Sequence, residues 1–283
     1  MKVFIIGAGH VGTTLSIIFE NAGFEVFIAS RSMKSAKKAA SISGAKACSV
    51  KECGGSDIVF LTVPDSEITN AAKNIEQFVT EKQVIVHTSG ALSSEILNFL
   101  PSHVASLHPL KSFADPVIAA SSIKETLFTF EGDKTAETVL EEIVKKIKGK
   151  FVKIKPQNKI LYHLAAVLAA NYTVSLADIS VNILKEIGFR ENDAKSAIVN
   201  LLKGVLENME NKGTVSALTG PIERGDADTV KKHLTAIKDP ILKNIYIFLG
   251  FATLSIAEQK GLNKRKIDDI RKVLNEQNNC SEG

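Results

Sequence analysis

The chain has 283 residues, which is more than one small hydrophobic core requires and is enough for one or two domains. With 45% hydrophobic residues, 6% aromatic residues and no tryptophan, its composition is that of an ordinary soluble protein. Its formal net charge of +4 arises from basic residues scattered among acidic ones, without the basic, aromatic-interleaved stripe of a nucleic-acid-binding surface, so we expect no nucleic-acid partner.

The cysteines and the apolar segments exclude further classes. Cys48, Cys53 and Cys280 match neither a zinc-ligand spacing nor a CxxC pair, so no metal site is expected. The first residues lack the apolar segment of a signal peptide, and the longest apolar helical pattern is interrupted by histidine, asparagine and aspartate, which argues against a membrane span. We therefore expect a protein of the reduced cytoplasm with no membrane partner.

The first predicted elements are a buried parallel strand at residues 2–6 and a helix at residues 13–22. The segment that joins them consists of Gly7, Ala8, Gly9, His10, Val11 and Gly12. A strand, a Gly-x-Gly-x-x-Gly turn and a helix in this order form the dinucleotide-binding fingerprint. Gly7 permits the tight turn, Gly9 lets a pyrophosphate approach the backbone, and Gly12 lets the helix pack closely on the strand. The alternative is a glycine turn that binds nothing.

The second predicted strand, residues 25–29, ends where an acidic residue would bind the ribose of NAD, about 20 positions beyond the glycines. No acid is present there. The chain instead has Ser30, Arg31 and Ser32, followed by three lysines within the next six residues. A guanidinium and two hydroxyls are suited to a 2′-phosphate, so the sequence favours NADP over NAD. The alternative is that Arg31 is a solvated surface residue and Ser32 only caps the next helix.

Apolar strand-like runs alternate with helical patterns throughout residues 1–155, which predicts a doubly wound, mostly parallel α/β sheet of the Rossmann type. The predicted strands are 3–6, 25–29, 45–49, 58–63, 84–87, 104–107, 127–130 and 151–154. The predicted helices between them are 13–22, 35–43, 66–78, 93–99 and 135–148. We expect residues 1–155 to form the NADP-binding domain.

Residues 156–283 contain no convincing strand, so we expect a smaller all-helical domain for substrate binding and dimerisation. One long apolar helix is predicted at residues 157–187, beginning after Pro156 and closed by Gly188. Further helices are predicted at 191–211, 228–237 and 240–260, and residues 275–283 are expected to be a frayed tail.

Four motifs then indicate a family. They are HTSGALSSE at 87–95, SLHPLKSF at 106–113, YHLAAVLAANY at 162–172 and LTGPIERGD at 218–226. Together they resemble a family of Rossmann-like proteins with a helical C-terminal domain of unknown function, assigned only as NADP oxidoreductases. This family lies within the superfamily of 6-phosphogluconate, prephenate and pyrroline-carboxylate enzymes. The resemblance spans nearly the whole chain and implies the fold and the class of cofactor, but no substrate.

Histidine is the natural group to exchange a proton during hydride transfer. His108 and Ser89 follow two neighbouring predicted strands, at the edge of the sheet where ligands bind. Both match the layout of the similar prephenate dehydrogenases, which implies that His108 acts as general acid/base and that Ser89 orients the reacting group. The flanking residues depart from that motif, which speaks against prephenate itself. The alternative is a hydrogen-bonded histidine at a strand end.

The predicted long helix carries polar residues along one side. They are Lys159, His163, Asn171, Ser175, Asp178 and Asn182. The resemblance to sister dehydrogenases implies that His163 and Asn171 complete the substrate cleft, whereas Lys159 is expected to be solvated. The alternative is a polar network at a dimer interface.

Three further sites in the sequence have roles that the sequence leaves undecided. Val63, Pro64 and Asp65 are expected to pass the adenosine and pyrophosphate side of the cofactor and mainly to shape the backbone. Arg224 either pairs with a substrate carboxylate or forms an internal ion pair, and Lys111 either lines the cleft or is exposed.

The sequence therefore predicts an NADP(H)-dependent oxidoreductase that acts on a small, carboxylated hydroxy, keto or imino substrate, and a homodimer held by apolar helices. One alternative is a non-catalytic NADPH-binding sensor or regulatory protein. Another is transfer between NADP and a flavin or deazaflavin, as in one member of the wider superfamily.

Overall fold

The computed structural model describes residues 1–278, and these fall into two compact units, the first Met1–Ser175 and the second beginning at Leu176. Within the described residues no strand follows Lys153, so the predicted change from strands to helices near residue 155 is present. The division between compact units comes later in the chain, because the segment after residue 155 first packs on the sheet of the first unit.

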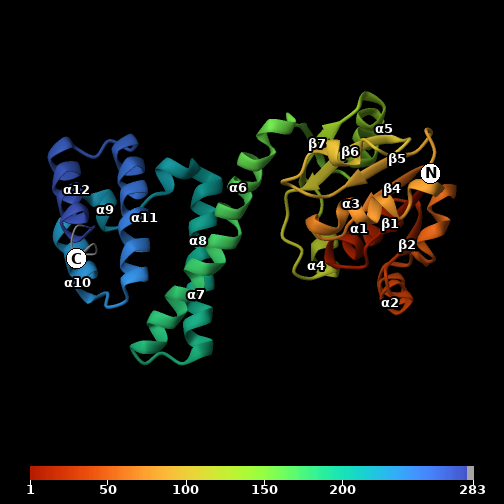
Figure 1. The fold of residues 1–283 in the computed structure, drawn as a ribbon. Coiled ribbons are helices and arrows are strands. Elements are labelled where there is room, and N and C mark those ends of the chain that lie inside the picture. The colour runs from red at the N-terminus through yellow and green to blue at the C-terminus, as the bar shows by residue number, and fades with distance from the viewer. Residues whose placement is uncertain (279–283) are drawn as a thin grey trace. The chain divides into compact units, whose positions relative to one another are not determined.

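The first unit is an eight-stranded sheet with the order β3-β2-β1-β4-β5-β6-β7-β8 (Figure 1). Neighbouring strands pair in parallel, apart from the antiparallel pair of β6 and β7. The strands are β1 (Lys2–Ile6), β2 (Glu25–Ala29), β3 (Lys46–Ala47), β4 (Ile58–Leu61), β5 (Val84–His87), β6 (His103–Pro109), β7 (Leu127–Gly132) and β8 (Lys150–Lys153). The order 3-2-1-4-5-6 is that of dinucleotide-binding sheets, so the predicted doubly wound fold is confirmed.

Helices cover both faces of this sheet. Successive side chains of β1 point to opposite faces and are buried on both, so each face needs a covering layer. Val3 and Ile5 pack with α1, α2 and α5, whereas Phe4 and Ile6 pack with α3 on the opposite face. The helices of this unit are α1 (His10–Asn21), α2 (Met33–Ser43), α3 (Ile68–Lys73), α4 (Pro116–Ser121), α5 (Lys134–Lys146) and α6 (Lys159–Ala169). Both faces are therefore apolar cores, which explains why the central strands are continuous apolar runs.

Two predicted helices are shorter than expected, and one helix was not predicted. Within residues 66–78 only α3 is an α-helix, flanked by 3₁₀ turns, and residues 93–99 contain only the 3₁₀ helix η4 (Ser94–Leu97). The unpredicted helix, α4, has a clear local cause. Asp115 accepts hydrogen bonds from the amides of Val117 and Ile118, and proline occupies the first helical position.

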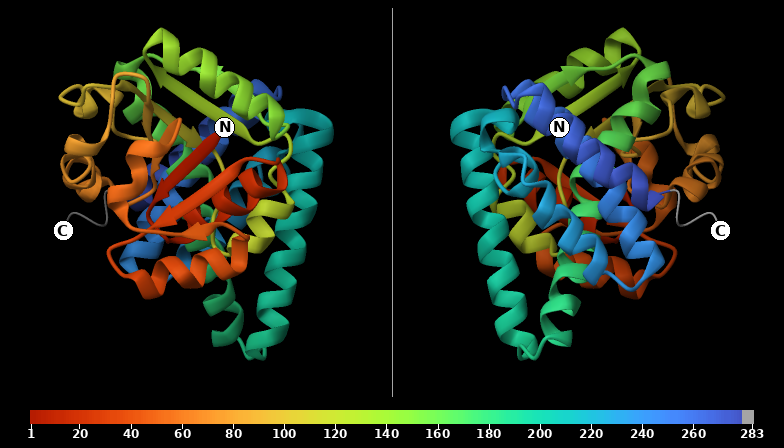
Figure 2. Two further views of the ribbon diagram at one scale, coloured as in Figure 1. Left: turned by 90° about the vertical axis from the view of Figure 1, so that its right-hand side faces the viewer. Right: turned by 90° about the vertical axis from the view of Figure 1, so that its left-hand side faces the viewer.

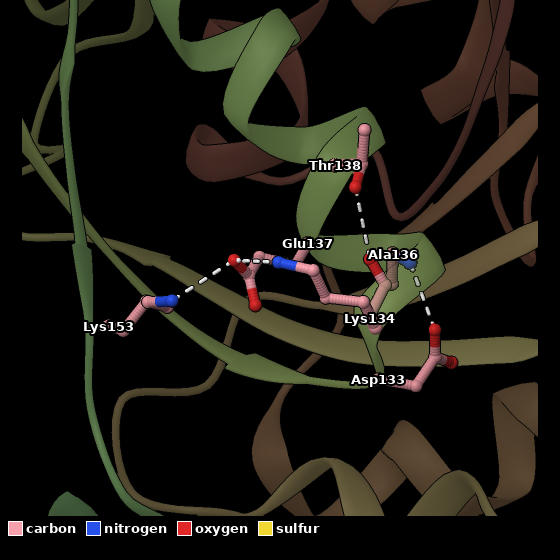
Figure 3. A network of polar contacts seen from close by, with 6 residues as sticks. All are labelled: Asp133, Lys134, Ala136, Glu137, Thr138 and Lys153. Carbon is pink, nitrogen blue, oxygen red and sulfur yellow. Dashed lines mark hydrogen bonds and ion pairs between the residues drawn. The ribbon is translucent and has the colours of Figure 1, made fainter.

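An aspartate also caps the N-terminus of α5 (Figure 3), as it does in α4. Asp133 accepts a hydrogen bond of 2.9 Å from the amide of Ala136 and so caps the helix. Glu137 in the first turn pairs with Lys134 at 2.8 Å and with Lys153 of β8 at 3.1 Å. Both lysines are largely exposed, so these ion pairs add little stability.

The predicted single helix over residues 157–187 is not continuous. It consists of a 3₁₀ turn (Pro156–Asn158), α6 and α7 (Asn171–Glu186), with a kink at Ala170, where φ is −104° and ψ is −64°. Because φ at Ala170 departs from the usual helical value of about −63° while staying in the α region, side chains before and after Ala170 do not share one straight face. The predicted polar stripe is therefore divided into two parts.

The second unit is entirely helical within the described residues. Its helices are the greater part of α7, α8 (Glu191–Ala217), α9 (Pro221–Arg224), α10 (Ala227–Ala236), α11 (Pro240–Gln259) and α12 (Lys264–Asn278). α7 and α8 run side by side in opposite directions (Figure 2). Val230, Ile247 and Ile270 bring α10, α11 and α12 into one apolar core. The expected frayed tail is helical as far as Asn278, and its remainder, with Cys280, lies outside the described residues.

Two helical segments are long and apolar enough to cross a membrane by length and composition, Pro156–Glu186 and Pro240–Gln259. In the most apolar 18-residue stretch of each segment, 6% of the residues are buried in the first and 22% in the second. This is weak evidence for a span, because the apolar helices of soluble proteins meet the same criterion. Exposed apolar side chains on the first segment include Ile160, Leu161, Leu164 and Leu168.

Candidate functional site

The glycine turn after β1 has the geometry expected of a dinucleotide site. Gly7 has φ of +122°, and a Cβ there would lie 2.5 Å from the carbonyl oxygen of Thr62. A Cβ on Gly12 would lie 1.9 Å from the carbonyl oxygen of Gly7, so only glycine permits this close approach of helix and strand. A Cβ on Gly9 would meet no atom within 4 Å, which leaves the backbone open to a ligand at this position.

The start of α1 offers donors to that open position. Within the described residues, the amides of His10, Val11 and Gly12 have no hydrogen-bond partner, and no side chain caps the helix. Such an N-terminus, with its partial positive charge, binds pyrophosphate oxygens in proteins of this fold. These residues fit the dinucleotide that the fingerprint implies.

A cavity of about 330 Å³ extends from this turn to the ends of β2 and β4. Of the predicted cofactor residues, Gly7, Ala8, Gly9, Ser30, Arg31, Val63 and Pro64 line it. Arg31 forms no ion pair with the described residues, so its guanidinium is available to a phosphate. Ser32 stands at the N-cap of α2 without a capping hydrogen bond from its side chain, which contradicts the alternative that it serves only as a cap.

Ser89 and Asp65 meet at the edge of the sheet formed by the carboxyl ends of the parallel strands. The Ser89 hydroxyl donates to Oδ2 of Asp65 at 2.7 Å and accepts from the amides of Ala91 and Leu92 at 3.1 and 3.0 Å. Its one donor and both acceptor positions are therefore in use. Asp65, predicted mainly to shape the backbone, also accepts this hydrogen bond from Ser89.

His108 lies close to His163, as the predicted cleft requires. The Nδ1 atom of His108 is 2.7 Å from the hydroxyl oxygen of Tyr162. A Cβ built on Gly90 would lie 3.1 Å from Nε2 of His108 and 3.1 Å from Cδ2 of His163, so both imidazoles pack against this glycine. One site thus contains the loop after β5, the end of β6 and the first turns of α6.

Lys159 is the main difference from the sequence-based expectation. It was expected to be solvated, but it is 1% exposed. Its Nζ donates to Oγ of Ser106 at 2.6 Å and to the carbonyl oxygen of Ser89 at 3.2 Å, which joins α6 to β6 and to the loop after β5. Within the described residues it has no acidic partner at ion-pair distance. A buried cation thus lies close enough to His108 to act on its charge.

Burial and charge shift the pKa values of these groups. Burial lowers the pKa of His108 to about 4, with further lowering by the charges of Lys159 and His163. Burial likewise lowers the pKa of Lys159 from 10.5 to about 8, an effect that Glu131 and Asp65 oppose. The near-neutral pKa expected for His108 is therefore not found in the free protein, and Lys159 titrates closer to neutral pH.

His87 has a different role from His108. Its ring is fully buried, its Nδ1 accepts from the amide of Ser89 at 3.2 Å, and its Nε2 donates to the carbonyl of Ser93 at 3.2 Å. Burial lowers its pKa to about 4, so it remains neutral and shapes the loop.

The other predicted positions take no part in the hydrogen bonds of this cluster within the described residues. Asn171 follows the kink, is exposed, and its side chain has no hydrogen bond to the described residues. Lys111 donates to the carbonyl of Ser122 at 2.9 Å. The side chain of Arg224 forms no ion pair within residues 1–278, so the internal pair considered for it is absent there. The side chain of Asp226 in the same motif caps α10.

Tyr162, Gly90, Ser106 and Lys159 were not predicted as site residues. All four occur in or beside the motifs at 87–95, 106–113 and 162–172, so their positions were visible in the sequence. Their contacts were not, because the bonds of Tyr162 to His108 and of Lys159 to Ser106 join segments more than 50 residues apart.

Two family profiles match the chain. The profile of a Rossmann-like domain matches residues 1–109, and that of a domain of unknown function (DUF2520) matches residues 126–253. The crystal structure of protein TM1727 from Thermotoga maritima is 31% identical, with a TM-score of 0.74, and the alignment covers 91% of this chain and 99% of that chain. The chain belongs to this family of Rossmann-like proteins with a DUF2520 domain. The predicted family resemblance is thereby confirmed.

More distant structures share the fold of this family. Protein BF3122 from Bacteroides fragilis, whose assignment as an NADP oxidoreductase is itself provisional, is 22% identical with a TM-score of 0.74 over 91% of this chain and 98% of that chain. Pyrroline carboxylate reductase from Plasmodium falciparum, with NADP bound, is 14% identical with a TM-score of 0.60 over 99% and 98%. Proteins with this fold thus include nicotinamide-dependent reductases. No curated protein sequence matches the chain.

Proposed function

We propose that this protein is an NADP(H)-dependent oxidoreductase that acts on a small, carboxylated hydroxy, keto or imino compound. The observation that carries the proposal is the cavity that joins the glycine turn to Arg31. It combines pyrophosphate donors with a guanidinium that has no ion pair among residues 1–278. The nicotinamide would supply or accept the hydride. The residues of this chain bind the nucleotide, hold the substrate and exchange its proton.

His108 is the group proposed to exchange that proton. Tyr162 occupies its Nδ1, so Nε2 is the nitrogen left beside Gly90 and His163. With a pKa of about 4, the imidazole is neutral near pH 7. Its Nε2 accepts a proton from a substrate hydroxyl in the tautomer whose ring proton lies on Nδ1 and is donated to the Tyr162 oxygen. Ser89 would orient the same hydroxyl by exchanging its bond to Asp65 for one to the substrate.

The buried cation supports a carboxylated substrate. Lys159 has no acidic partner at ion-pair distance within the described residues, and an uncompensated buried charge is costly. A bound carboxylate beside His108 would lower that cost through the low-dielectric interior, whereas a neutral substrate would not. Arg224 remains a second candidate for carboxylate binding.

A non-catalytic NADPH sensor is the second candidate function. It is favoured by the low pKa of His108 and by the fully bonded Ser89 hydroxyl, since neither group is poised for chemistry in the free protein. A sensor would bind the nucleotide tightly, would not transfer hydride to any metabolite, and would have a protein partner whose affinity depends on the nucleotide.

The first test is a titration of the purified protein with NADPH and with NADH, followed by nicotinamide fluorescence. We expect NADPH to bind at least about tenfold more tightly, a difference of about 1.4 kcal/mol. Arg31→Ala should abolish this preference, and Lys38→Ala, which removes an exposed cation of α2 outside the cavity, should leave it unchanged. If neither nucleotide binds, both the oxidoreductase and the sensor proposals fail.

A homodimer is proposed as the functional assembly. Leu161, Leu164 and Leu168 of α6 are 68%, 47% and 52% exposed, and their spacing of three and four residues places them on one face of the helix. An exposed apolar helix face of this kind marks an interface. We propose that a second copy of this chain covers this surface, in line with the homodimer expected from the sequence.

A further inference from the structure

The orientation of the peptide bond between Ser89 and Gly90 is fixed by two buried side chains. The carbonyl oxygen of Ser89 accepts two hydrogen bonds, from Oγ of Ser106 at 3.1 Å and from Nζ of Lys159 at 3.2 Å. Ser106 and Lys159 also bond to each other at 2.6 Å, and both are buried. A hydroxyl and a buried ammonium group therefore fix the direction in which this peptide points.

The amide of Gly90 must point the opposite way, because the peptide is trans and its N–H and C=O are antiparallel. Gly90 is buried, and within residues 1–278 its N–H has no hydrogen-bond partner, although the amides of Ser89, Ala91 and Leu92 on either side all have one. A buried amide without a partner is rare and costs free energy. Its persistence here suggests that the partner is a ligand.

The surroundings of Gly90 indicate where that ligand would lie. The position of a Cβ on Gly90 is 3.1 Å from Nε2 of His108 and 3.1 Å from Cδ2 of His163. The unpaired amide thus belongs to the residue against which both imidazoles pack. Any side chain at this position would press on those rings, so glycine keeps the backbone accessible to a small molecule beside them.

We propose that the Gly90 N–H is an oxygen-binding group of this site, which donates to a carboxylate or carbonyl oxygen of the substrate. Lys159 acts as a positioning residue through the Ser89 carbonyl. The proposal rests on the proposed function in that the oxygen belongs to its substrate, but it assigns a contact and a role for Lys159 that the nucleotide site does not require.

The electrostatic argument explains why a lysine is buried at this place. Two donors on one carbonyl oxygen withdraw electron density from the amide, so the N–H on its far side becomes a stronger donor. One of the donors is charged, which strengthens the effect. A fixed, polarised N–H directed at a point where negative charge lies or develops stabilises that charge without reorganisation.

The chain allows this single amide to be observed directly. Ser-Gly occurs at two places, 43–44 and 89–90, so protein labelled with 13C-carbonyl serine and 15N-glycine gives carbonyl-filtered amide signals from Gly44 and Gly90 alone. Gly44 is a built-in control, since its amide donates to the carbonyl of Ala40 at 2.9 Å at the end of α2. The probe is oxalate, a small anion with carboxylate oxygens, added to protein saturated with NADP⁺.

We expect oxalate to move the Gly90 amide proton downfield in a saturable manner and to leave Gly44 in place. Lys159→Met and Ser106→Ala should each weaken oxalate binding at least about fivefold, whereas Lys155→Met, an exposed lysine four residues earlier, should not. The Gly44 signal of each variant reports whether the unit is folded, and Ser106→Ala tests the same peptide if Lys159→Met does not fold.

Three results would overturn the proposal. They are saturable oxalate binding that leaves the Gly90 signal unmoved, equal movement of both glycine signals, and no movement up to about 50 mM oxalate, where even weak anion sites are occupied. Nucleotide binding is measured on the same samples by fluorescence. An unmoved Gly90 signal with NADPH bound rejects this inference alone, whereas absence of nucleotide binding rejects the proposed function.

Discussion

The imidazole of His108 and the phenol of Tyr162 meet edge to face, with ring centroids 5.5 Å apart and Nδ1 of His108 2.7 Å from the tyrosine oxygen. Tyr162 lies on α6 one turn after Lys159. The same helix end therefore supplies the group that holds His108 and the cation that adds to the lowering of the His108 pKa by burial. His108 comes from β6. The orientation of the proposed proton acceptor therefore depends on the docking of α6 against the sheet.

Tyr162→Phe should release His108 from one tautomer. Because Nδ1 loses its partner, both tautomers become populated, and kcat/KM with a verified substrate should fall about tenfold to a hundredfold. The imidazole 15N shifts of His108 report the tautomer directly, and the pH profile reports its pKa.

Tyr246→Phe is the matched control, because Tyr246 makes the same contact with Nδ1 of His233 at 2.9 Å in the second unit. It should leave the His108 signals and kcat/KM unchanged. An unaltered His108 tautomer in Tyr162→Phe would contradict the positioning role.

His108→Ala should lower kcat/KM with a verified substrate by about 10²–10⁴-fold, the usual contribution of a general acid or base. The affinity for NADPH should be unchanged, since His108 does not line the nucleotide cavity. A loss of less than about threefold would remove His108 from this role.

Gly9→Ala and Gly12→Ala should have different effects on NADPH binding and on the stability of the protein. At Gly9 a Cβ meets no atom within 4 Å, so alanine should keep the melting temperature but block the approach of a pyrophosphate. At Gly12 a Cβ would collide with the Gly7 carbonyl, so alanine should lower both the melting temperature and the affinity for NADPH. Thermal unfolding and nucleotide fluorescence measure the two effects, and equal melting temperatures for both variants would contradict the packing role of Gly12.

The folded protein should gain stability with rising pH because of Lys159. Its pKa is about 8 when folded and 10.5 as the ordinary value, so the unfolded chain binds the proton more tightly between these pH values. The free energy of unfolding of the wild type, relative to Lys159→Met, should therefore rise by about 2–3 kcal/mol from pH 7 to pH 10.5. Urea unfolding at a series of pH values measures this difference. The difference in free energy of unfolding between the wild type and Lys155→Met should not change with pH. If the difference between the wild type and Lys159→Met did not change with pH either, burial would not lower the pKa of Lys159.

A homodimer is expected at micromolar concentration in analytical ultracentrifugation. Leu161→Lys with Leu168→Lys should shift the protein towards the monomer, because each substitution places a charge on an exposed apolar surface of α6. Lys155→Met, just before this helix, is the control. A wild-type monomer would rule out the dimer.

Much of the fold follows from local pattern. The strands are continuous apolar runs because both faces of the sheet are covered, and steric contacts explain the glycines at positions 7 and 12 of the turn. The antiparallel pairing of β6 and β7 was not predicted, since an apolar run does not reveal the direction of its neighbour. The kink at Ala170 was not predicted either, because alanine is the best helix former and gives no local warning.

By itself the sequence determined the class of fold, the nucleotide turn, the basic residue at the end of β2 and the position of His108 at a strand end, because each depends on residues close together in the chain. Only the tertiary structure decided that Lys159 is buried rather than solvated, that Tyr162 holds His108, and that the Gly90 amide has no partner among the residues that the structure describes. These facts arise where α6 meets the ends of β5 and β6, and contacts between segments so distant in the chain are set by packing rather than by local pattern.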